Sequence, residues 1–154
     1  MPDAPEPVLV SACLLGRSCR YDGSHNRDGA LERALAERGC APVPFCPEEA
    51  GGLGTPRPPA WLGGGGADAV LAGEARVVTD QGRDVTDAFL AGAHAALDAC
   101  RAHGITRAFL KERSPSCGAR RTHVEGALVD GPGVTAALLT SQGILVEGVE
   151  GRRR

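Results

Sequence analysis

Aromatic residues are scarce in this sequence of 154 residues, which has one Trp, one Tyr and three Phe. The hydrophobic core therefore has to be built mostly from Ala, Val and Leu. The sequence also lacks any apolar run approaching the ~20 residues that a membrane-spanning helix needs. Nor is there an excess of positive charge, since the net charge is −2 and a protein that binds nucleic acid normally carries a strong basic field. Membrane insertion and nucleic-acid binding are therefore not the favoured functions.

The N-terminus does not resemble a targeting signal. Its first residues, MPDAPEPVLVSACLLG, contain no basic segment, and acidic residues precede the apolar stretch, whereas a secretory signal peptide begins with positive charge. We therefore expect a cytoplasmic protein, in which cysteines stay reduced. Six cysteines in such a chain point to metal binding or catalysis and not to a disulfide framework.

The composition is typical of one folded domain. Hydrophobic residues make up 42% and charged residues 23% of the chain, which argues against extensive disorder, and this length suits a single core. We expect one domain over 1–154, with frayed tails at 1–7 and 148–154. Glycine (22 residues) and proline (11 residues) are abundant, which indicates long functional loops on a compact scaffold.

Apolar periodicity predicts alternating strands and helices along the chain. Strands are expected at 8–10, 43–45, 107–111 and 144–146, helices at 28–38, 87–103 and 134–139, and a β-hairpin at 75–85. Thr86 is the expected N-cap of the second helix, and the glycine- and proline-rich stretch 47–67 is expected to be irregular. This order predicts an α/β fold with one mostly parallel, Rossmann-like sheet, flanking helices and a β-hairpin insertion.

Three cysteines follow predicted strands. Cys13 comes after the first strand, Cys46 after the second, and Cys117 lies in the loop after the strand at 107–111. Because the carboxyl ends of parallel strands meet at one edge of a sheet, and ligands bind there, we expect these three thiols to converge.

The other three cysteines have different interpretations. Cys100 lies on the apolar face of a predicted helix and Cys40 directly follows the residue that ends one, so both are expected in the core. Cys19 lies in a loop near Cys13 and is a possible fourth ligand. Zinc fingers place two to four residues between paired ligands, but five residues separate Cys13 from Cys19 and Cys40 from Cys46. Spacing alone leaves an iron–sulfur cluster, a zinc ion and buried or catalytic thiols as alternatives.

Reactive side chains surround the three converging cysteines. Glu48 and Glu49 follow Cys46, and Ser114 and Ser116 precede Cys117. In an extended segment Glu48 would face the site and Glu49 would point away. Two charged residues in turns, Asp22 and Arg57, are candidates for substrate binding, although solvated turn roles fit them equally well. His25, after the first of these turns, is a further candidate for the lining of the site.

Several strings of residues resemble a known family. SACLLG with CRYDG, PFCPEE with GGLGTPRPP, GRDVT, KERSPSCG and GVTAALL are similar to the thiouracil desulfidase family, long catalogued as a domain of unknown function. The resemblance covers roughly residues 8–146. One departure is the segment 119–126, ARRTHVEG, which is shorter than the family's usual segment with its YDGTF-like run.

The resemblance implies a small α/β enzyme that binds a [4Fe-4S] cluster through Cys13, Cys46 and Cys117 and leaves one iron not bound by protein. The open iron would take the sulfur of a thiolated nucleobase such as 2-thiouracil, and its C–S bond would be hydrolysed to release sulfide without net redox change. Because a carboxylate two residues from Cys46 can activate water near the cluster, we expect Glu48 to act as the general base, with Ser114 or Ser116 orienting the base ring or passing the proton. The alternative is that Glu48 caps the following turn or pairs with Arg57. The expected partners are a small thiolated base or thioamide and the iron–sulfur assembly machinery.

Two other functions remain open at this point. One is a non-catalytic iron–sulfur or zinc protein with a structural or sensing metal, which Cys19 as a fourth ligand would favour. The other is a module that recognises modified nucleotides in RNA through the basic C-terminal residues, against which the mild acidity of the chain argues.

Overall fold

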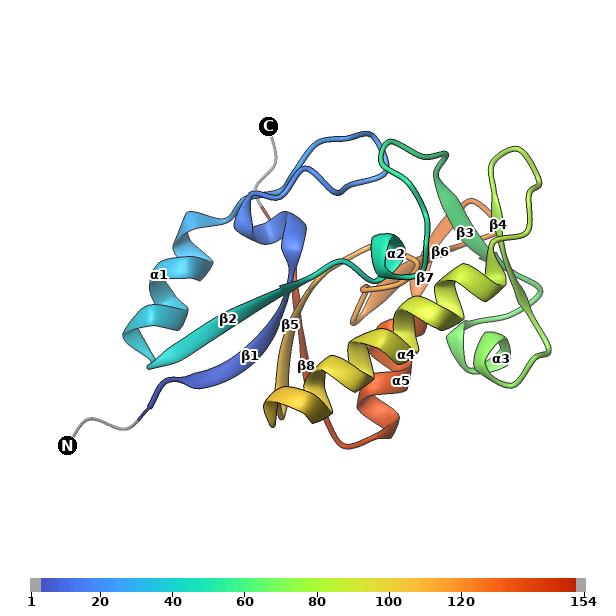
Figure 1. Ribbon diagram of the computed structural model, residues 1–154. Helices are drawn as coiled ribbons and strands as arrows, with labels where there is room; N and C mark the ends of the chain where they lie inside the picture. The colour runs from blue at the N-terminus through green and yellow to red at the C-terminus, as the bar shows by residue number, and fades with distance from the viewer. Residues whose placement is uncertain (1–3, 152–154) are drawn as a thin grey trace.

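The computed structural model describes residues 4–151 and contains two four-stranded sheets (Figure 1). The first sheet has the order β2 (Cys40–Phe45), β1 (Glu6–Ser11), β5 (Arg107–Lys111) and β8 (Leu145–Val149), and all of its pairings are parallel. Its long helices are α1 (Gly29–Glu37), α4 (Thr86–His103) and α5 (Val134–Ser141). The predicted α/β fold with a mostly parallel sheet and flanking helices is confirmed.

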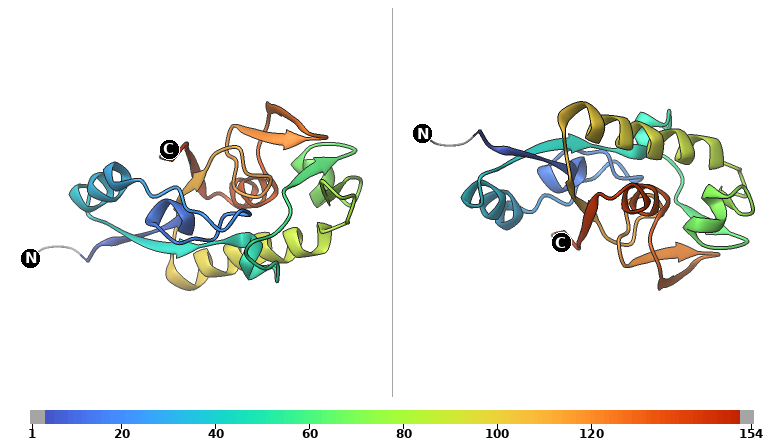
Figure 2. Two further views of the ribbon diagram at one scale, coloured as in Figure 1. Left: turned by 90° about the horizontal axis from the view of Figure 1, so that it is seen from above. Right: turned by 90° about the horizontal axis from the view of Figure 1, so that it is seen from below.

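The helices cover both faces of the first sheet, as parallel strands require. Along β1, Leu9 packs into a cluster with residues of α4 and α5, whereas Val8 and Val10 pack into another with Leu35 of α1. This alternation follows from the two-residue period of a strand. Figure 2 shows α1 on one side of the sheet and the α4–α5 pair on the other.

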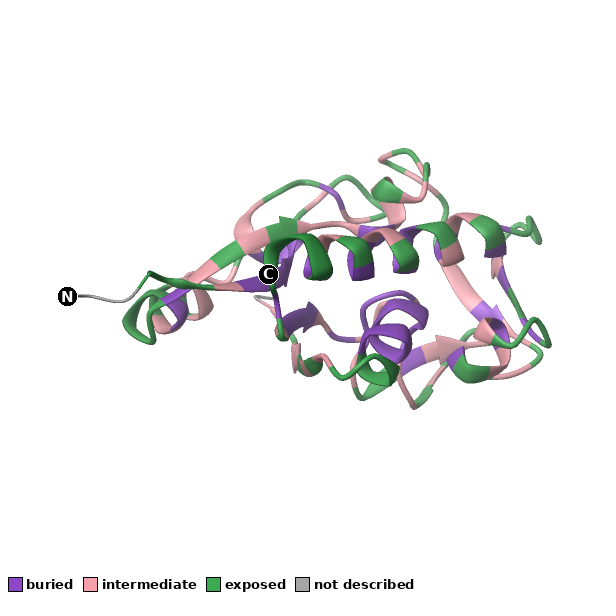
Figure 3. Cartoon of the chain, turned by 60° about the horizontal axis from the view of Figure 1, so that its bottom comes forward, coloured by how far each residue is buried: buried purple, intermediate pink, exposed green. Residues whose placement is uncertain are grey.

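The helix α5 is buried on almost every side, while α4 buries one stripe and exposes the other to solvent (Figure 3). The buried stripe of α4 includes Phe89, Ala93, Leu97 and Cys100. Cys100 is therefore a core residue, and Cys40 is buried at the start of β2, as the sequence predicts for both. No helix within residues 4–151 has the length and apolar character to cross a membrane.

The second sheet is not predicted by the sequence. Its order is β4 (Arg76–Thr79), β3 (Ala60–Gly63), β6 (Arg121–Val124) and β7 (Ala127–Asp130). The expected β-hairpin over 75–85 is present in a short form: Val78 and Asp84 form an antiparallel bridge, flanked by the hydrogen bonds Thr79 N to Arg83 O at 2.8 Å and Val85 N to Val77 O at 2.9 Å. On its other side β4 pairs antiparallel with β3, which the sequence does not predict. Strands of four residues are too short for a clear alternating pattern, and β3 lies inside the stretch expected to be irregular. The short helix α3 (Ala67–Leu71) follows β3.

The ends of several elements differ from the sequence-based expectations. Thr86 is not the N-cap of α4: Val85 occupies that position, and Thr86 Oγ1 accepts a hydrogen bond from Val77 N at 2.8 Å. The expected tails at 1–7 and 148–154 are partly ordered, because β1 begins at Glu6 and β8 ends at Val149. The basic residues 152–154 and residues 1–3 lie outside the described part of the chain.

Close helix packing positions the segment that carries Cys46. The short helix α2 (Pro47–Ala50) begins directly after this cysteine and lies against α4. A Cβ atom at Gly51 would lie 2.0 Å from the Ala88 carbonyl oxygen, and one at Gly92 would lie 2.0 Å from the Pro47 carbonyl oxygen. Because only glycine permits this approach, the two glycines determine how closely α2 and the adjoining cysteine sit on α4.

Candidate functional site

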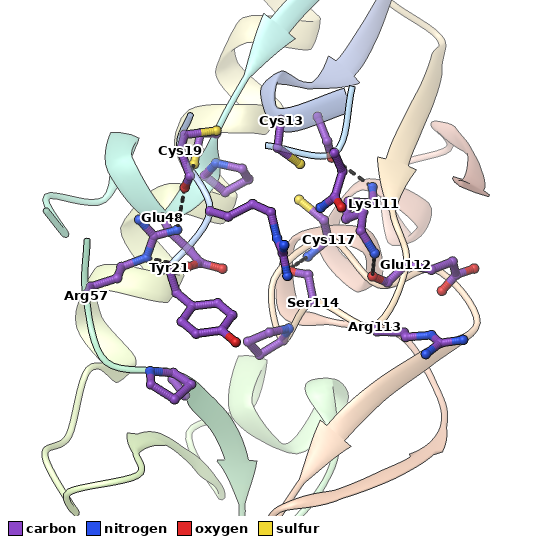
Figure 4. Close-up of a pocket in the computed structure, with 18 of the residues that line it drawn as sticks. Cys13, Cys19, Tyr21, Glu48, Arg57, Lys111, Glu112, Arg113, Ser114 and Cys117 are labelled. Carbon is purple, nitrogen blue, oxygen red and sulfur yellow. Dashed lines mark hydrogen bonds and ion pairs between the residues drawn. The ribbon is translucent and has the colours of Figure 1, made fainter. Parts of the chain in front are cut away.

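A cavity of about 920 Å³ lies between the carboxyl end of the first sheet and strands β3 and β6 of the second (Figure 4). Four of the six cysteines line it: Cys13, Cys19, Cys46 and Cys117. The predicted convergence of the three strand-end cysteines on one cavity is therefore observed. Cys40 and Cys100 are not among its lining residues.

Each of these cysteines is positioned by the element that precedes it. Cys13 lies in the short 3₁₀-helix η1 (Ala12–Leu15), which follows β1 without a break. Cys46 follows β2 as the N-cap of α2. Cys117 lies in the tight turn after β5, and Figure 4 shows its sulfur and that of Cys13 directed into the cavity.

Cys19 is close to Cys46, although 27 positions separate them in sequence. The two sulfur atoms and a carboxylate oxygen of Glu49 all lie within 4.8 Å of one another. The segment forms the helix α2 and is not extended; Glu48 lines the cavity and Glu49 does not, but the Glu49 carboxylate faces the pair Cys19 and Cys46. Its carboxylate also accepts a hydrogen bond from Thr55 Oγ1 at 2.6 Å.

The environment of these thiols favours their protonated form in the absence of a cation. The neighbouring Cys13 side chain, together with burial, raises the pKa of Cys19 to about 11. Cys19 and burial raise the pKa of Cys46 as well, and burial raises the pKa of Cys117 to about 12. Reactive thiols are typically found where the pKa is lowered. These raised pKa values argue against an activated thiol nucleophile, whereas the crowding of several soft donors fits metal or cluster binding.

Hydroxyl groups surround Cys117. Ser114 Oγ accepts hydrogen bonds from the backbone N–H groups of Ser116 and Cys117, at 3.1 Å and 3.0 Å, so it holds the turn in place. Ser11 and Ser116 contact the Cys117 side chain by hydrogen bonding and oppose the rise of its pKa. Ser114 lines the cavity, but Ser116 is fully buried behind it, with its Oγ 2.6 Å from Thr135 Oγ1.

Glu48 and Arg57 form a buried ion pair on the cavity wall. Arg57 Nε donates to Glu48 Oε2 at 2.7 Å, and the two side chains are 8% and 15% exposed, with Arg57 the lower. Arg57 Nη2 also donates to the Cys19 carbonyl oxygen at 2.8 Å. A buried, charge-assisted hydrogen bond of this kind orients a carboxylate. The pairing of Glu48 with Arg57, which the sequence offered as an alternative to a catalytic role, is therefore present.

Asp22 is not part of the cavity lining. Its Oδ1 accepts hydrogen bonds from the backbone N–H and the hydroxyl group of Ser24, at 3.0 Å and 2.5 Å, and these bonds lower the pKa of Asp22. These contacts agree with the second interpretation that the sequence allowed for Asp22, a structural role in a solvated turn. His25 does line the cavity.

Several lining residues carry little signal in the sequence. Tyr21, Trp61, Lys111 and His123 all face the cavity. Burial lowers the pKa of Lys111, whose Nζ donates to the Glu112 carbonyl oxygen at 2.9 Å. Tyr21 and Lys111 belong to the CRYDG and KERSPSCG strings, which could have indicated them, whereas Trp61 and His123 come from the unpredicted second sheet.

The Glu112 carboxylate ties the segment after Cys117 to the first sheet. It is 2% exposed and accepts hydrogen bonds from the backbone N–H groups of Ala119, Arg120 and Arg121. A Cβ atom at Gly148 of β8 would lie 1.8 Å from its Oε2. Burial acts to raise the pKa of Glu112, but the hydrogen bonds from Arg120 and its neighbours outweigh this and lower it.

We expect Glu112→Gln to destabilise the fold by about 2–3 kcal/mol, because an amide nitrogen would face backbone donors that the carboxylate now satisfies. The folded pKa of Glu112 lies below its ordinary value, so its contribution to stability is present above the unfolded pKa and is lost as pH falls through the folded one. Thermal unfolding should show a smaller loss of stability in acid for this variant than for the parent. The exposed Glu37→Gln serves as the control, and equal acid sensitivity of Glu112→Gln and the parent would contradict the expectation.

Comparisons with known proteins agree with this arrangement. The model of the 2-thiouracil desulfurase family matches residues 8–150. A Bacillus subtilis (strain 168) protein described as uncharacterized protein YbbK is 41% identical over 142 residues, which cover 90% of this chain and 93% of the relative. A solved structure described as the [4Fe-4S]-dependent thiouracil desulfidase TudS superimposes with a TM-score of 0.77 at 45% identity, covering 93% of this chain and 90% of that one.

Proposed function

Because this chain belongs to the 2-thiouracil desulfurase family, we propose that it is an iron–sulfur-dependent, non-redox desulfidase. It hydrolyses the C–S bond of a thiolated nucleobase such as 2-thiouracil and releases sulfide. The observation that carries this function is the convergence of Cys13, Cys46 and Cys117 on one cavity with the Glu48 carboxylate in its wall. The fold agrees with that of a structure described as a [4Fe-4S]-dependent thiouracil desulfidase.

The donor set fits a [4Fe-4S] cluster. Thiolates are the ligands that such clusters take in proteins, and here they project from three different strand ends into one cavity. We assign Cys13, Cys46 and Cys117 as the ligands, which leaves one iron not bound by protein. A cluster bound in this way supplies a soft Lewis acid for the sulfur of the substrate. Delivery of the cluster to the chain requires the iron–sulfur assembly machinery.

Glu48 is the proposed general base of the reaction. The Arg57 guanidinium holds its Oε2, and among residues 4–151 no group donates to its other oxygen, which can therefore accept a proton from water. The water oxygen bonds to the thiocarbonyl carbon as the C–S bond breaks, so that 2-thiouracil and water give uracil and hydrogen sulfide. No electron donor is needed for this balance.

Ser114 is the proposed proton carrier or ring-orienting group. Its oxygen accepts two backbone hydrogen bonds, and no acceptor in the described part of the chain takes its own proton. The hydroxyl group can therefore donate to a ring nitrogen or to the departing sulfur. Ser116, buried behind Cys117 and bonded to Thr135, is proposed to act through the cysteine that it contacts. Arg57 acts by positioning Glu48, and Asp22 by shaping its turn.

The function is tested by incubating the anaerobically prepared protein with 2-thiouracil in ¹⁸O-labelled water. We expect sulfide and uracil in equal amounts, with one labelled oxygen in each uracil and no requirement for a reductant. Product that forms only with an added electron donor, or uracil without the label, would contradict hydrolysis. A folded, cluster-loaded protein that releases no sulfide from 2-thiouracil would contradict the substrate assignment.

A further inference from the structure

The trio Cys19, Cys46 and Glu49 lies beside the proposed cluster site but has a different geometry. Their three potential ligand atoms are all within 4.8 Å of one another. Cys19 is buried and the other two are half-buried. They come from three segments, namely the loop after η1, the end of β2 and the helix α2. Glu49 and Cys19 have no part in the proposed desulfidation.

These separations suit one metal ion. Two thiolates on a tetrahedral zinc ion at ~2.3 Å from the metal are about 3.8 Å apart, and a carboxylate oxygen binds at ~2.0–2.2 Å. Thiolates on different irons of a cubane are more widely spread, because each occupies another corner of the cube. We propose that Cys19, Cys46 and Glu49 form a mononuclear site for a divalent metal ion of zinc type.

The surroundings of the trio support coordination. Thr55 Oγ1 donates to Glu49 Oε2 at 2.6 Å, and Arg57 donates to both Thr55 Oγ1 and the Cys19 carbonyl oxygen. Hydrogen bonds of this kind orient metal ligands. Binding releases the two thiol protons and places two thiolates and a carboxylate on a dication. The single negative charge that remains is balanced by cationic side chains nearby, such as Arg17, which contacts Glu49 at 3.0 Å.

The site shares Cys46 with the proposed cluster, so the two metals exclude each other. This consequence rests on the proposed function, whereas the mononuclear site itself rests only on the geometry of the trio. A chain that has bound zinc through Cys46 cannot load a cluster until the zinc leaves. The sequence allowed Cys19 as a fourth ligand of the cluster. In this proposal Cys19 belongs to the mononuclear site instead.

The test uses Co²⁺ as a spectroscopic probe in the full-length protein, freed of metal under anaerobic conditions. One equivalent of Co²⁺ should give thiolate-to-cobalt charge-transfer bands that Zn²⁺ displaces. Cys19→Ala should weaken binding by about 100-fold or more, and Glu49→Gln by about 10-fold or more, since even outer partners of a ligand contribute 10–100-fold. Cys117→Ala and Cys100→Ala are matched cysteine controls and should keep the bands.

A second measurement counts iron and sulfide after reconstitution. Cys19→Ala should load the cluster as the parent does, which also shows that it folds, whereas Cys117→Ala should not. Prior addition of one equivalent of Zn²⁺ should reduce loading of the parent and leave loading of Cys19→Ala unchanged.

Parent-like cobalt affinity in Cys19→Ala, or loss of the bands in Cys117→Ala, would overturn the mononuclear site. Full cluster loading with zinc still bound would overturn the exclusion. The cobalt titration needs no cluster and no substrate. It therefore tests the mononuclear site even if the protein is found not to be a desulfidase.

Discussion

Glu48→Gln is expected to slow sulfide release from 2-thiouracil by at least about 100-fold, while iron and sulfide contents remain those of the parent. General-base assistance is worth typically ~10²–10⁴-fold, and glutamine keeps the size of the side chain but cannot take a proton. Its amide oxygen can still accept the hydrogen bond that Arg57 Nε now donates to Glu48 Oε2 at 2.7 Å. The change therefore removes the base with little disturbance of the cavity wall.

The measurement is the rate of sulfide release per bound cluster under saturating substrate. Glu37→Gln, an identical exchange at an exposed position at the end of α1, is the control and should turn over at the parent rate. A purely structural ion pair of Glu48 with Arg57 predicts loss of stability without a specific loss of rate. Parent-like turnover in Glu48→Gln with an intact cluster would refute the role as a base.

Replacing Cys13, Cys46 or Cys117 by Ser is expected to abolish the cluster. The anaerobically purified parent should hold about four iron and four sulfide per chain, as a cubane requires. Serine offers a harder oxygen that iron–sulfur clusters bind poorly compared with a thiolate. With three protein ligands, loss of any one leaves two, so all three variants should lose iron, sulfide and desulfidase activity together.

The matched controls are Cys40→Ser and Cys100→Ser, which change a buried cysteine outside the cavity. Both should keep the full cluster, although the buried hydroxyl group costs about 1–3 kcal/mol of stability. Iron and acid-labile sulfide analysis with an absorption spectrum decides the outcome. A zinc-free parent that takes up no iron and sulfide on anaerobic reconstitution, or a full cluster in Cys117→Ser, would contradict the assignment.

The positions of the three proposed ligands were accessible from the sequence because they depend on local pattern and one general rule. Val8 to Val10, Val43 to Phe45 and Arg107 to Lys111 are recognisable as strands, and each proposed ligand follows one of them. Parallel strands place their carboxyl ends at one edge. The convergence of Cys13, Cys46 and Cys117 then follows without knowledge of any contact between them, and the long KERSPSCG and SACLLG strings indicate the family.

Only the tertiary structure decided the contacts between irregular segments. The pairing of Glu48 with Arg57, the closeness of Cys19 to Cys46 and the burial of Ser116 depend on loops that have no periodicity and are held by packing from elsewhere. The second sheet escaped prediction for a related reason: its strands have four residues each, and β3 pairs with β6 across some 60 positions of the chain. The spacing of hydrophobic residues indicates which face of a helix or strand is buried. It does not indicate which distant loops contact each other, because the shape of the assembled core determines those contacts.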